Sequence, residues 1–404
     1  MLTYSLSGSS SELVLNVLTM VLNQGKPLDR AYSHNFSGLQ LEPAEQARIT
    51  VVAGDILRRL NLYCFIVDIE QDEFERLGSK LLNGWHLFHD LALPKMQYSL
   101  QVDEATLRAN IEAAKAIPTL WDGCPEWLDI LGDAQLGEKW PAERAALMQA
   151  PKRYIRVNSL KCDRETLMEK LVKEGVDTQI VESVDSALEV TSNSALFRTD
   201  CFQKGLFEQQ DAGSQLVAAA VDAKPGMRVV DACAGAGGKT LHIAAQMQGK
   251  GRLLAMDIEQ WKLDNLKTRA KRAGAHNVET RIIASSKTIK RLKLTADRVL
   301  LDVPCSGLGV LKRNPDSKWR DTAERLPILI ELQKQIIDSY SRMVKVGGML
   351  VYATCSIMPD ENRNQVDRFL ADNPHFSLID DESILVSEHG FDGFYIARMS
   401  RDSE

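Results

Sequence analysis

Residues 227–240 read MRVVDACAGAGGKT, and this stretch predicts the architecture of the second half of the chain. A short apolar run rich in valine leads into a loop with three glycines, and apolar residues then recur at helical spacing in KTLHIAAQM (239–247). Glycines between a strand and a helix let the backbone approach a ligand at the helix N-terminus, as in open α/β sheets that bind nucleotides. The stretch therefore predicts a strand, a ligand-binding loop and a helix.

Further apolar runs repeat this pattern towards the C-terminus. They alternate with helical segments, which predicts a parallel, Rossmann-like sheet covered on both faces. The last two runs have no long helix between them, so we expect an antiparallel pair at one edge of the sheet. The runs are RLLAMDI (252–258), TRIIAS (280–285), DRVLLDV (297–303), GMLVYATC (348–355), FSLID (376–380) and GFYIARM (393–399).

The first part of the chain has a different pattern. Residues 1–145 show apolar residues at helical spacing and carry no visible catalytic constellation. A strand, a helix and a second strand then follow closely in 153–183. We expect an all-α domain at 1–120, a linker with a small α+β unit at 121–204, and the α/β sheet domain at 205–404.

Composition is that of a soluble enzyme, with 44% hydrophobic and 26% charged residues among 404. The longest apolar runs are too short to span a membrane, and no basic segment precedes them, so neither a membrane anchor nor a signal peptide is expected. Seven cysteines without a CxxC pair indicate free thiols in a reducing cytoplasm, rather than disulfides or structural zinc.

The net charge of −6 is unevenly distributed. Residues 1–150 carry 12 basic against 20 acidic residues, whereas the remainder carries 37 against 35. Basic runs in this second part are either solvated helix faces or an RNA-binding surface, and the sequence leaves both open. The runs begin at 151 (PKR), 262 (KLDNLKTRAKR), 287 (KTIKRLK) and 312 (KRNPDSKWR).

The glycine loop and the end of the next predicted strand together suggest an adenosine-containing cofactor. Asp257 ends that strand, where a carboxylate can bind the two hydroxyls of a ribose. A phosphate-binding GxxxxGK[ST] loop is less consistent, because Cys233 stands where its first glycine is required. These residues leave the choice between NAD and S-adenosylmethionine open.

Two cysteines follow the fourth and fifth strands of the predicted sheet. Cys305 lies in DVPCSG and Cys355 in ATCS, at carboxyl ends that face the same crevice as the glycine loop. Each alone is most simply a packing residue, and no nearby histidine supports a metal site. A sulfur nucleophile beside a methyl donor suits addition to C6 of a pyrimidine, with Asp302 at the N3 and amino edge of the ring and Lys239 near the base or developing charge.

Several motifs together carry a family resemblance. GLFEQQDAGSQ (205–215), DACAGAGGKT, DVPCSG, ATCS with PDEN, and GFDGFYIA (390–397) resemble the Sun/Fmu (NOL/NOP/Sun) family of RNA cytosine-C5 methyltransferases over about 120–400. The helical front end resembles the bacterial small-subunit rRNA members, whose N-terminal domain is NusB-like. The resemblance implies a cytoplasmic S-adenosyl-L-methionine-dependent enzyme acting on 16S ribosomal RNA, without a metal.

The resemblance also implies roles for individual residues. Cys355 would be the nucleophile that bonds to C6 and Cys305 would assist product release, whereas a DNA-type enzyme would attack with Cys305. Asp302 and Lys239 complete the catalytic set, and Asp302 also lies beside the cofactor. Asp257 would hold the ribose, and Ser285 stands where the family usually has an aspartate at the adenine. The cofactor loop comprises Cys233, Ala234, Gly235, Ala236, Gly237, Gly238 and Lys239.

The RNA substrate would present a cytosine from a loop or single strand, because the base must leave its stack. The basic runs 262–272 and 312–320 are candidates to hold flanking phosphates. Trp319 either stacks on a base or packs half-buried. We expect a monomer that contacts the RNA also through the small α+β unit. The alternatives are a catalytically idle RNA-binding or ribosome-assembly factor with the same fold and, more remotely, a P-loop NTPase.

Overall fold

The computed structural model describes residues 6–70, 74–94, 103–320 and 322–404. It divides into two compact units. The helical unit consists of Met1–Ala150 and Val310–Glu324, and the sheet unit consists of Pro151–Gly309 and Arg325–Glu404. The domain boundaries expected at residues 120 and 204 remain predictions.

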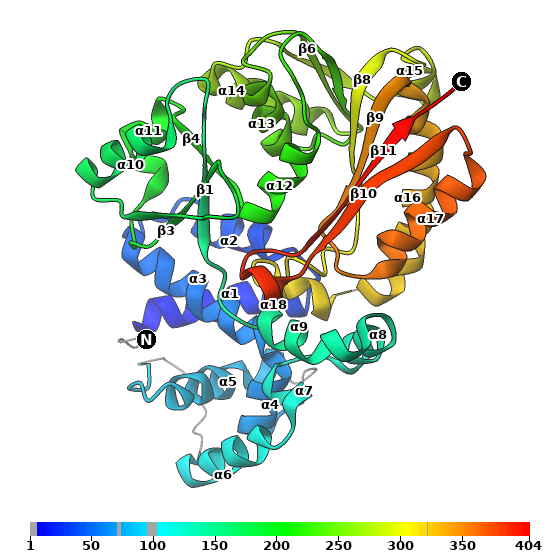
Figure 1. Ribbon diagram of the computed structural model, residues 1–404. Coiled ribbons are helices and arrows are strands. Elements are labelled where there is room, and N and C mark those ends of the chain that lie inside the picture. Colours follow the sequence, from blue (N-terminus) through cyan, green and yellow to red (C-terminus); the bar gives the residue numbers. More distant parts are fainter. Residues whose placement is uncertain (1–5, 71–73, 95–102, 321) are drawn as a thin grey trace. The chain divides into compact units, whose positions relative to one another are not determined.

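The described residues of the first 150 positions are helical, as the spacing of apolar residues predicts (Figure 1). Two helices open with proline, Pro43 and Pro118, where the missing N–H costs no hydrogen bond. The core is aliphatic and aromatic, with Leu57, Tyr63 and Trp85 fully or almost fully buried. The helices are α1 (Gly8–Leu22), α2 (Leu28–Phe36), α3 (Pro43–Arg58), α4 (Leu60–Val67), α5 (Phe74–Phe88), α6 (Glu104–Lys115), α7 (Pro118–Trp121), α8 (Glu126–Leu136), η2 (Gly137–Lys139) and α9 (Trp140–Leu147).

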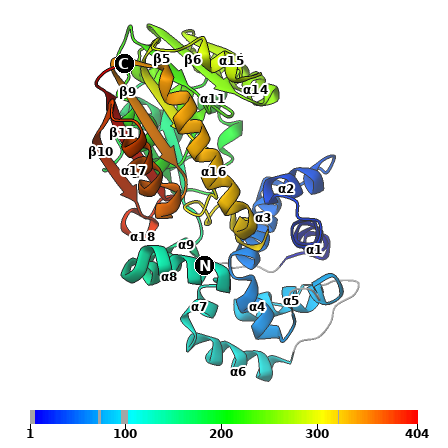
Figure 2. The ribbon, with the colours of Figure 1, turned by 90° about the vertical axis from the view of Figure 1, so that its right-hand side faces the viewer.

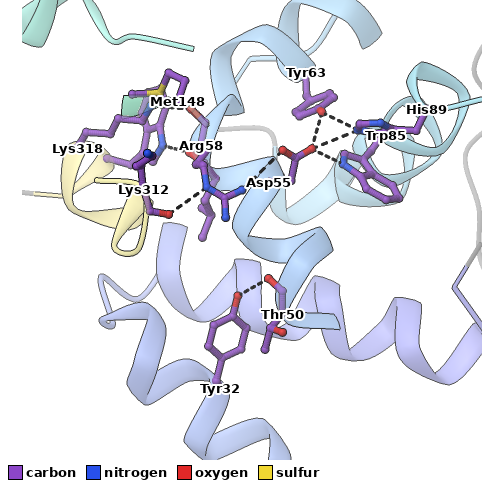
Figure 3. Close-up of polar contacts among 12 residues, drawn as sticks. Tyr32, Thr50, Asp55, Arg58, Tyr63, Trp85, His89, Met148, Lys312 and Lys318 are labelled. Atoms are coloured by element: carbon purple, nitrogen blue, oxygen red, sulfur yellow. Dashed lines mark hydrogen bonds and ion pairs between the residues drawn. The ribbon is translucent and has the colours of Figure 1, made fainter. Parts of the chain in front are cut away.

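One carboxylate collects several hydrogen bonds inside the helical unit (Figure 3). Oδ2 of Asp55 accepts from Oη of Tyr63 at 2.8 Å and from Nε1 of Trp85 at 2.8 Å. Nε2 of His89 lies 3.2 Å from the same oxygen. Burial alone would raise the pKa of Asp55, but these hydrogen bonds and the charge of Arg58 lower it to about 2.

Asp55→Ala is expected to destabilise the helical unit by about 3 kcal/mol, because the donors of Tyr63 and Trp85 lose their acceptor. Since the folded-state pKa of Asp55 lies below its usual value, its contribution is present at neutral pH and is lost as the pH falls towards 2. Urea denaturation followed by tryptophan fluorescence measures the change. Asp133→Ala, on the exposed surface of α8, is the control and should shift stability by less than about 0.5 kcal/mol. Equal changes in stability for the two substitutions would contradict a stabilising role for the hydrogen bonds of Asp55.

The segment Val310–Glu324, which contains η4 (Pro315–Trp319), contributes buried residues to the helical unit. Nζ of Lys318 donates to the carbonyl oxygens of Arg58 at 2.6 Å and Gly123 at 2.7 Å, and contacts Sδ of Met148 at 2.8 Å (Figure 3). Its side chain is buried, with a relative exposure of 1%. Burial lowers the pKa of Lys318 to about 7, and its amine donates to the last carbonyl of α3, which has no partner within the helix.

The prediction that run 312–320 holds RNA phosphates is therefore wrong for its buried lysines. Lys312 is 3% exposed, and its carbonyl accepts from Nε of Arg58 at 3.1 Å. Trp319 packs half-buried against the helical core and donates from Nε1 to the carbonyl of Leu57 at 2.5 Å. Of the two roles considered for Trp319, packing is the one the structure supports.

A small antiparallel sheet opens the sheet unit. Its strands lie in the order β2-β3-β1-β4, and α10 (Arg164–Lys173) packs Leu167 and Leu171 into its core. The expected strand, helix and strand at 153–183 are thus confirmed. The strands are β1 (Arg153–Val157), β2 (Thr178–Ile180), β3 (Ala187–Val190) and β4 (Phe207–Gln209), with η3 (Leu196–Arg198) and α11 (Asp200–Gln203) between the last two.

The larger sheet confirms the predicted fold class. Seven strands lie in the order β10-β11-β9-β8-β5-β6-β7, with β5 to β9 parallel and β11 antiparallel to both of its neighbours. The strands are β5 (Arg228–Asp231), β6 (Arg252–Asp257), β7 (Val278–Ile282), β8 (Ala296–Asp302), β9 (Val344–Thr354), β10 (Phe376–Ile384) and β11 (Phe394–Arg401). The helices are α12 (Ala212–Ala220), α13 (Gly238–Gln246), α14 (Gln260–Ala273), α15 (Ser286–Lys290), α16 (Thr322–Tyr340), α17 (Arg363–Asp372) and α18 (Val386–His389), with short turns η5 (Ser341–Met343) and η6 (Pro359–Glu361).

Apolar side chains on one face of this sheet form a core with α16 and α17. Val230 and Leu350 on the strands pack with Ile337 of α16 and Phe369 of α17, and Figure 2 shows α16 running along this face. The chain order reverses at β5, whose neighbours are β6 and β8. The carboxyl ends of β5 and β8 therefore flank a switch point, where open α/β sheets bind ligands. In the described parts of the chain, no helix has both the length and the apolar character needed to cross a membrane.

Candidate functional site

The glycine loop links β5 to α13 and requires glycine for two different reasons. Gly237 has a φ of +90°, and a Cβ there would lie 2.5 Å from Cγ of Leu266, so this position turns tightly against α14. Gly235 has a φ of +53°, and a Cβ there would meet no atom within 4 Å. The loop thus packs against the protein at Gly237 and leaves open space at Gly235, as a backbone cradle for a cofactor requires.

Asp257 and the glycine loop lie together at this end of the sheet. The carboxylate of Asp257 accepts from the backbone N–H of Gly235 at 2.9 Å and from that of Glu259 at 2.9 Å. It is therefore oriented beside the open part of the loop, where it can receive ribose hydroxyls. Ile258, which sequence reasoning missed, follows directly and is 70% exposed. An exposed apolar side chain next to the predicted ribose site fits the face of an adenine ring.

Ser285 lies beyond the end of β7, the strand beside β6. It is exposed and immediately precedes α15, and its hydroxyl caps no backbone N–H of that helix. The backbone N–H of Ile283 donates to the carbonyl of Asp257 at 2.8 Å, which ties this segment to the loop region. Ser285 is thus on the same edge of the sheet as Asp257.

Lys239 and Asp302 form an ion pair, with Nζ and Oδ2 at 2.7 Å. The ammonium group also lies 5.3 Å from the ring centre of Phe394 on β11. Burial lowers the pKa of Lys239, but the carboxylate of Asp302 and the sulfur of Cys355 more than offset this, so the pKa lies above its ordinary value. Lys239 is therefore a cation held between the predicted base-binding carboxylate and the predicted nucleophile.

The two predicted thiols meet, with the Sγ atoms of Cys305 and Cys355 at 3.2 Å. All seven cysteines of the chain are free. The hydrogen bond with Cys355, followed by burial, raises the pKa of Cys305 well above its usual value, so Cys305 keeps its proton. A protonated Cys305 can donate to a Cys355 thiolate. No cluster of three or more metal-binding side chains occurs within residues 6–70, 74–94, 103–320 and 322–404.

Buried polar groups brace the two thiol-bearing segments, and sequence reasoning assigned none of them a role. Glu361 accepts from the backbone N–H of Ser306 at 2.8 Å and from its hydroxyl at 2.5 Å. Nε2 of Gln333 donates to Glu361 at 2.9 Å and to the carbonyl of Pro304 at 3.0 Å. Glu361 lies in PDEN, one of the motifs that carry the family resemblance, and this motif was the signal in the sequence that could have pointed to it.

The basic run 262–272 is largely occupied within the protein. Arg269 and Arg272 both pair with Glu208 on β4, and Arg269 also donates to the carbonyl of Ala236 at 2.7 Å. These two arginines join the small sheet to α14, and the role of this run in holding RNA phosphates stays a prediction. In the run at 287, Lys287, Lys290, Arg291 and Lys293 are exposed.

Comparisons with known proteins agree with this geometry. Residues 218–400 match the family model described as "16S rRNA methyltransferase RsmB/F", and residues 124–196 match "Methyltr_RsmF/B-like, ferredoxin-like domain". The "Probable ribosomal RNA small subunit methyltransferase B" of Synechocystis is 33% identical over 298 residues, covering 69% of this chain and 66% of that protein. The chain thus spans just under two thirds of the length of that relative.

A second relative matches over nearly the whole chain. The "Ribosomal RNA small subunit methyltransferase B" of Vibrio cholerae is 32% identical over 422 residues, covering 96% of this chain and 93% of that protein. Among solved structures, the crystal structure of PH0851 superposes with a TM-score of 0.80 over 98% of this chain and 99% of that chain. At 23% identity this last likeness shows the fold.

The resemblance predicted from the motifs is confirmed by these matches, and with it S-adenosyl-L-methionine as the cofactor. The NusB-like character of the helical unit remains a prediction. The chain belongs to the RsmB/F family of 16S rRNA methyltransferases.

Proposed function

We propose that the protein methylates C5 of a cytosine in 16S ribosomal RNA, with S-adenosyl-L-methionine as methyl donor and Cys355 as covalent nucleophile. The observation that carries this proposal is the thiol pair at 3.2 Å beside the Lys239–Asp302 ion pair, at the strand ends next to the glycine loop. A methyltransferase acting on an already nucleophilic atom needs no thiol pair. C5 of cytosine does need one, because it becomes nucleophilic only after a group adds to C6.

In the first step the thiolate of Cys355 forms a bond to C6, and the electron pair of the C5–C6 double bond moves into the ring towards N3. Asp302 binds the N3 and amino edge, and a proton from the Lys239–Asp302 pair neutralises N3. C5 can then attack an electrophile. Bound S-adenosyl-L-methionine supplies the methyl group and leaves as S-adenosylhomocysteine.

Release reverses the addition. Once Cys355 is a neutral thioether, its hydrogen bond no longer holds the proton on Cys305, which can lose that proton to water. The Cys305 thiolate then takes the C5 proton, the C6–S bond breaks, and the C5–C6 double bond forms again. N3 returns its proton to the Lys239–Asp302 pair, and Cys355 leaves as a thiolate.

The cofactor site gives a separate prediction. Asp257 would bind the ribose, Ile258 would cover the adenine, and Ser285 would offer the adenine amino group a neutral acceptor. Ser285→Asp is expected to lower the Kd for S-adenosyl-L-methionine about fivefold, because a charged acceptor makes the stronger hydrogen bond. Titration calorimetry measures this. Ser286→Asp, one residue further along at the start of α15, is the control and should leave the Kd unchanged.

Titration calorimetry also distinguishes a methyltransferase from the alternative, a catalytically idle assembly factor with the same fold. Failure of the unaltered protein to bind S-adenosyl-L-methionine at millimolar concentration would favour that role over catalysis. The direct test of the proposed reaction is incubation with unmodified 16S rRNA and the cofactor, followed by nucleoside mass spectrometry. We expect 5-methylcytidine among the nucleosides, and a methyl group on any other atom would contradict the proposed reaction.

A further inference from the structure

The carboxylate of Glu361 lies within the thiol-bearing loops, although neither the catalytic nor the cofactor-binding set contains it. Its relative exposure is 0%, and it accepts from the N–H of Ser306, the hydroxyl of Ser306 and the amide of Gln333. Both oxygens of Glu361 accept hydrogen bonds, an arrangement that suits an ionised carboxylate.

This buried carboxylate forms no ion pair with the described residues. A buried charge balanced only by neutral donors is costly, and a glutamine could brace the same segments with less desolvation. The negative charge therefore calls for a reason beyond packing. Cys305 is the neighbouring group that this charge can affect. Its pKa is raised first by the hydrogen bond with Cys355 and by burial, and Glu361 adds to the same effect.

Opposite charges act on the two sulfurs. The Lys239 ammonium interacts with Cys355, and the Glu361 carboxylate interacts with Cys305. The sulfurs themselves are 3.2 Å apart and share one hydrogen bond, so the pair readily holds a single proton. The cation favours a thiolate at Cys355, and the anion disfavours one at Cys305.

We propose that Glu361 is a positioning residue whose buried negative charge keeps the shared proton on Cys305 and thereby makes Cys355 the nucleophile. The proposal rests on the proposed function for the identity of the nucleophile. Glu361 is then the group that makes two otherwise similar thiols differ in how tightly they hold the proton. Glu361 does this while its hydrogen bonds hold Ser306, the residue after Cys305, in place.

The test is the pH dependence of alkylation of each thiol by iodoacetamide in the full chain, read peptide by peptide by mass spectrometry. The groups facing the pair are Lys239, Asp302, Glu361 and Tyr352, and the phenol of Tyr352 donates to the backbone carbonyl of Glu361 at 2.7 Å. In the unaltered protein Cys355 should react at lower pH than Cys305.

Glu361→Gln should move the midpoint of Cys305 alkylation down by about one pH unit or more. It should slow methyl transfer about tenfold, with an unchanged Kd for the cofactor. Glu361→Asp retains the charge and should keep Cys355 the first to react. Gln333→Leu removes a hydrogen-bond donor to Glu361 but leaves its charge unchanged. It is the control for loosening of the thiol-bearing segments, and Cys355 should still react before Cys305 in this variant.

Ser306→Ala should shift the midpoint of Cys305 alkylation in the opposite direction. This second test is informative even if the Glu361→Gln variant does not fold. It removes a donor from the carboxylate, so alkylation of Cys305 should move to higher pH. An unchanged Cys305 midpoint in folded Glu361→Gln, or a fall in Ser306→Ala, would overturn the proposal. Alkylation needs no RNA, so loss of the predicted midpoints is distinguishable from failure of the methylation reaction itself.

Discussion

Cys355→Ala is expected to abolish methyl transfer, by at least about 10⁴-fold, and to prevent any covalent protein–RNA complex. Without the sulfur, C6 receives no nucleophile and C5 stays unreactive. Cys305→Ala is expected to accumulate a covalent protein–RNA adduct, because methylation proceeds while the C5 proton is not removed. Denaturing gel electrophoresis with labelled RNA measures both outcomes.

Cys162→Ala is a matched control, since Cys162 is a half-buried thiol in the small α+β part of the sheet unit. It should leave methyl transfer and adduct formation unchanged. An adduct formed by Cys355→Ala and lost in Cys305→Ala would assign the attack to Cys305, the arrangement considered for a DNA-type enzyme.

Lys239→Met is expected to reduce methyl transfer about 10³-fold and to destabilise the sheet unit by about 2 kcal/mol. Asp302 would then retain its charge in a partly buried site without the ammonium 2.7 Å away. N3 would also lose its proton source, and Cys355 would lose the cation that favours its thiolate. Single-turnover kinetics and urea denaturation measure the two effects.

The double variant Lys239→Met with Asp302→Asn separates stability from chemistry. Removing both charges should restore most of the lost stability, because no unpaired charge remains, but methyl transfer should stay low. Arg252→Met, which breaks an exposed ion pair with Glu279 on β7 outside the basic runs, is the control and should change neither quantity appreciably. Recovery of activity in the double variant would show that the pair serves only stability.

Much of the fold was predictable because the sheet follows local rules. Apolar runs such as RVLLD predict buried strands, and parallel strands bring their carboxyl ends to the same edge of the sheet. That geometry alone predicted that Cys305 and Cys355, fifty residues apart, would lie near the glycine loop. The thiol contact at 3.2 Å and the pairing of Lys239 with Asp302 are the packed outcome of that arrangement.

The remaining features depend on contacts between segments far apart in the sequence. A basic run looks the same whether it faces water or the interior, so Lys318 gave no sign that carbonyls of Arg58 and Gly123 would surround its amine. Arg269 and Arg272 likewise find Glu208 some sixty residues away. Glu361 was visible within PDEN, but only the fold shows that its carboxylate reaches Ser306.

Bisulfite sequencing of 16S rRNA shows directly whether the protein methylates a cytosine through Cys355. The RNA would come from a strain lacking the gene and from the same strain expressing either the unaltered protein or Cys355→Ala. We expect one cytosine whose protection from bisulfite is lost in the deletion strain, restored by the unaltered protein and not restored by Cys355→Ala. Restoration by Cys355→Ala, or an identical pattern in all strains, would contradict it.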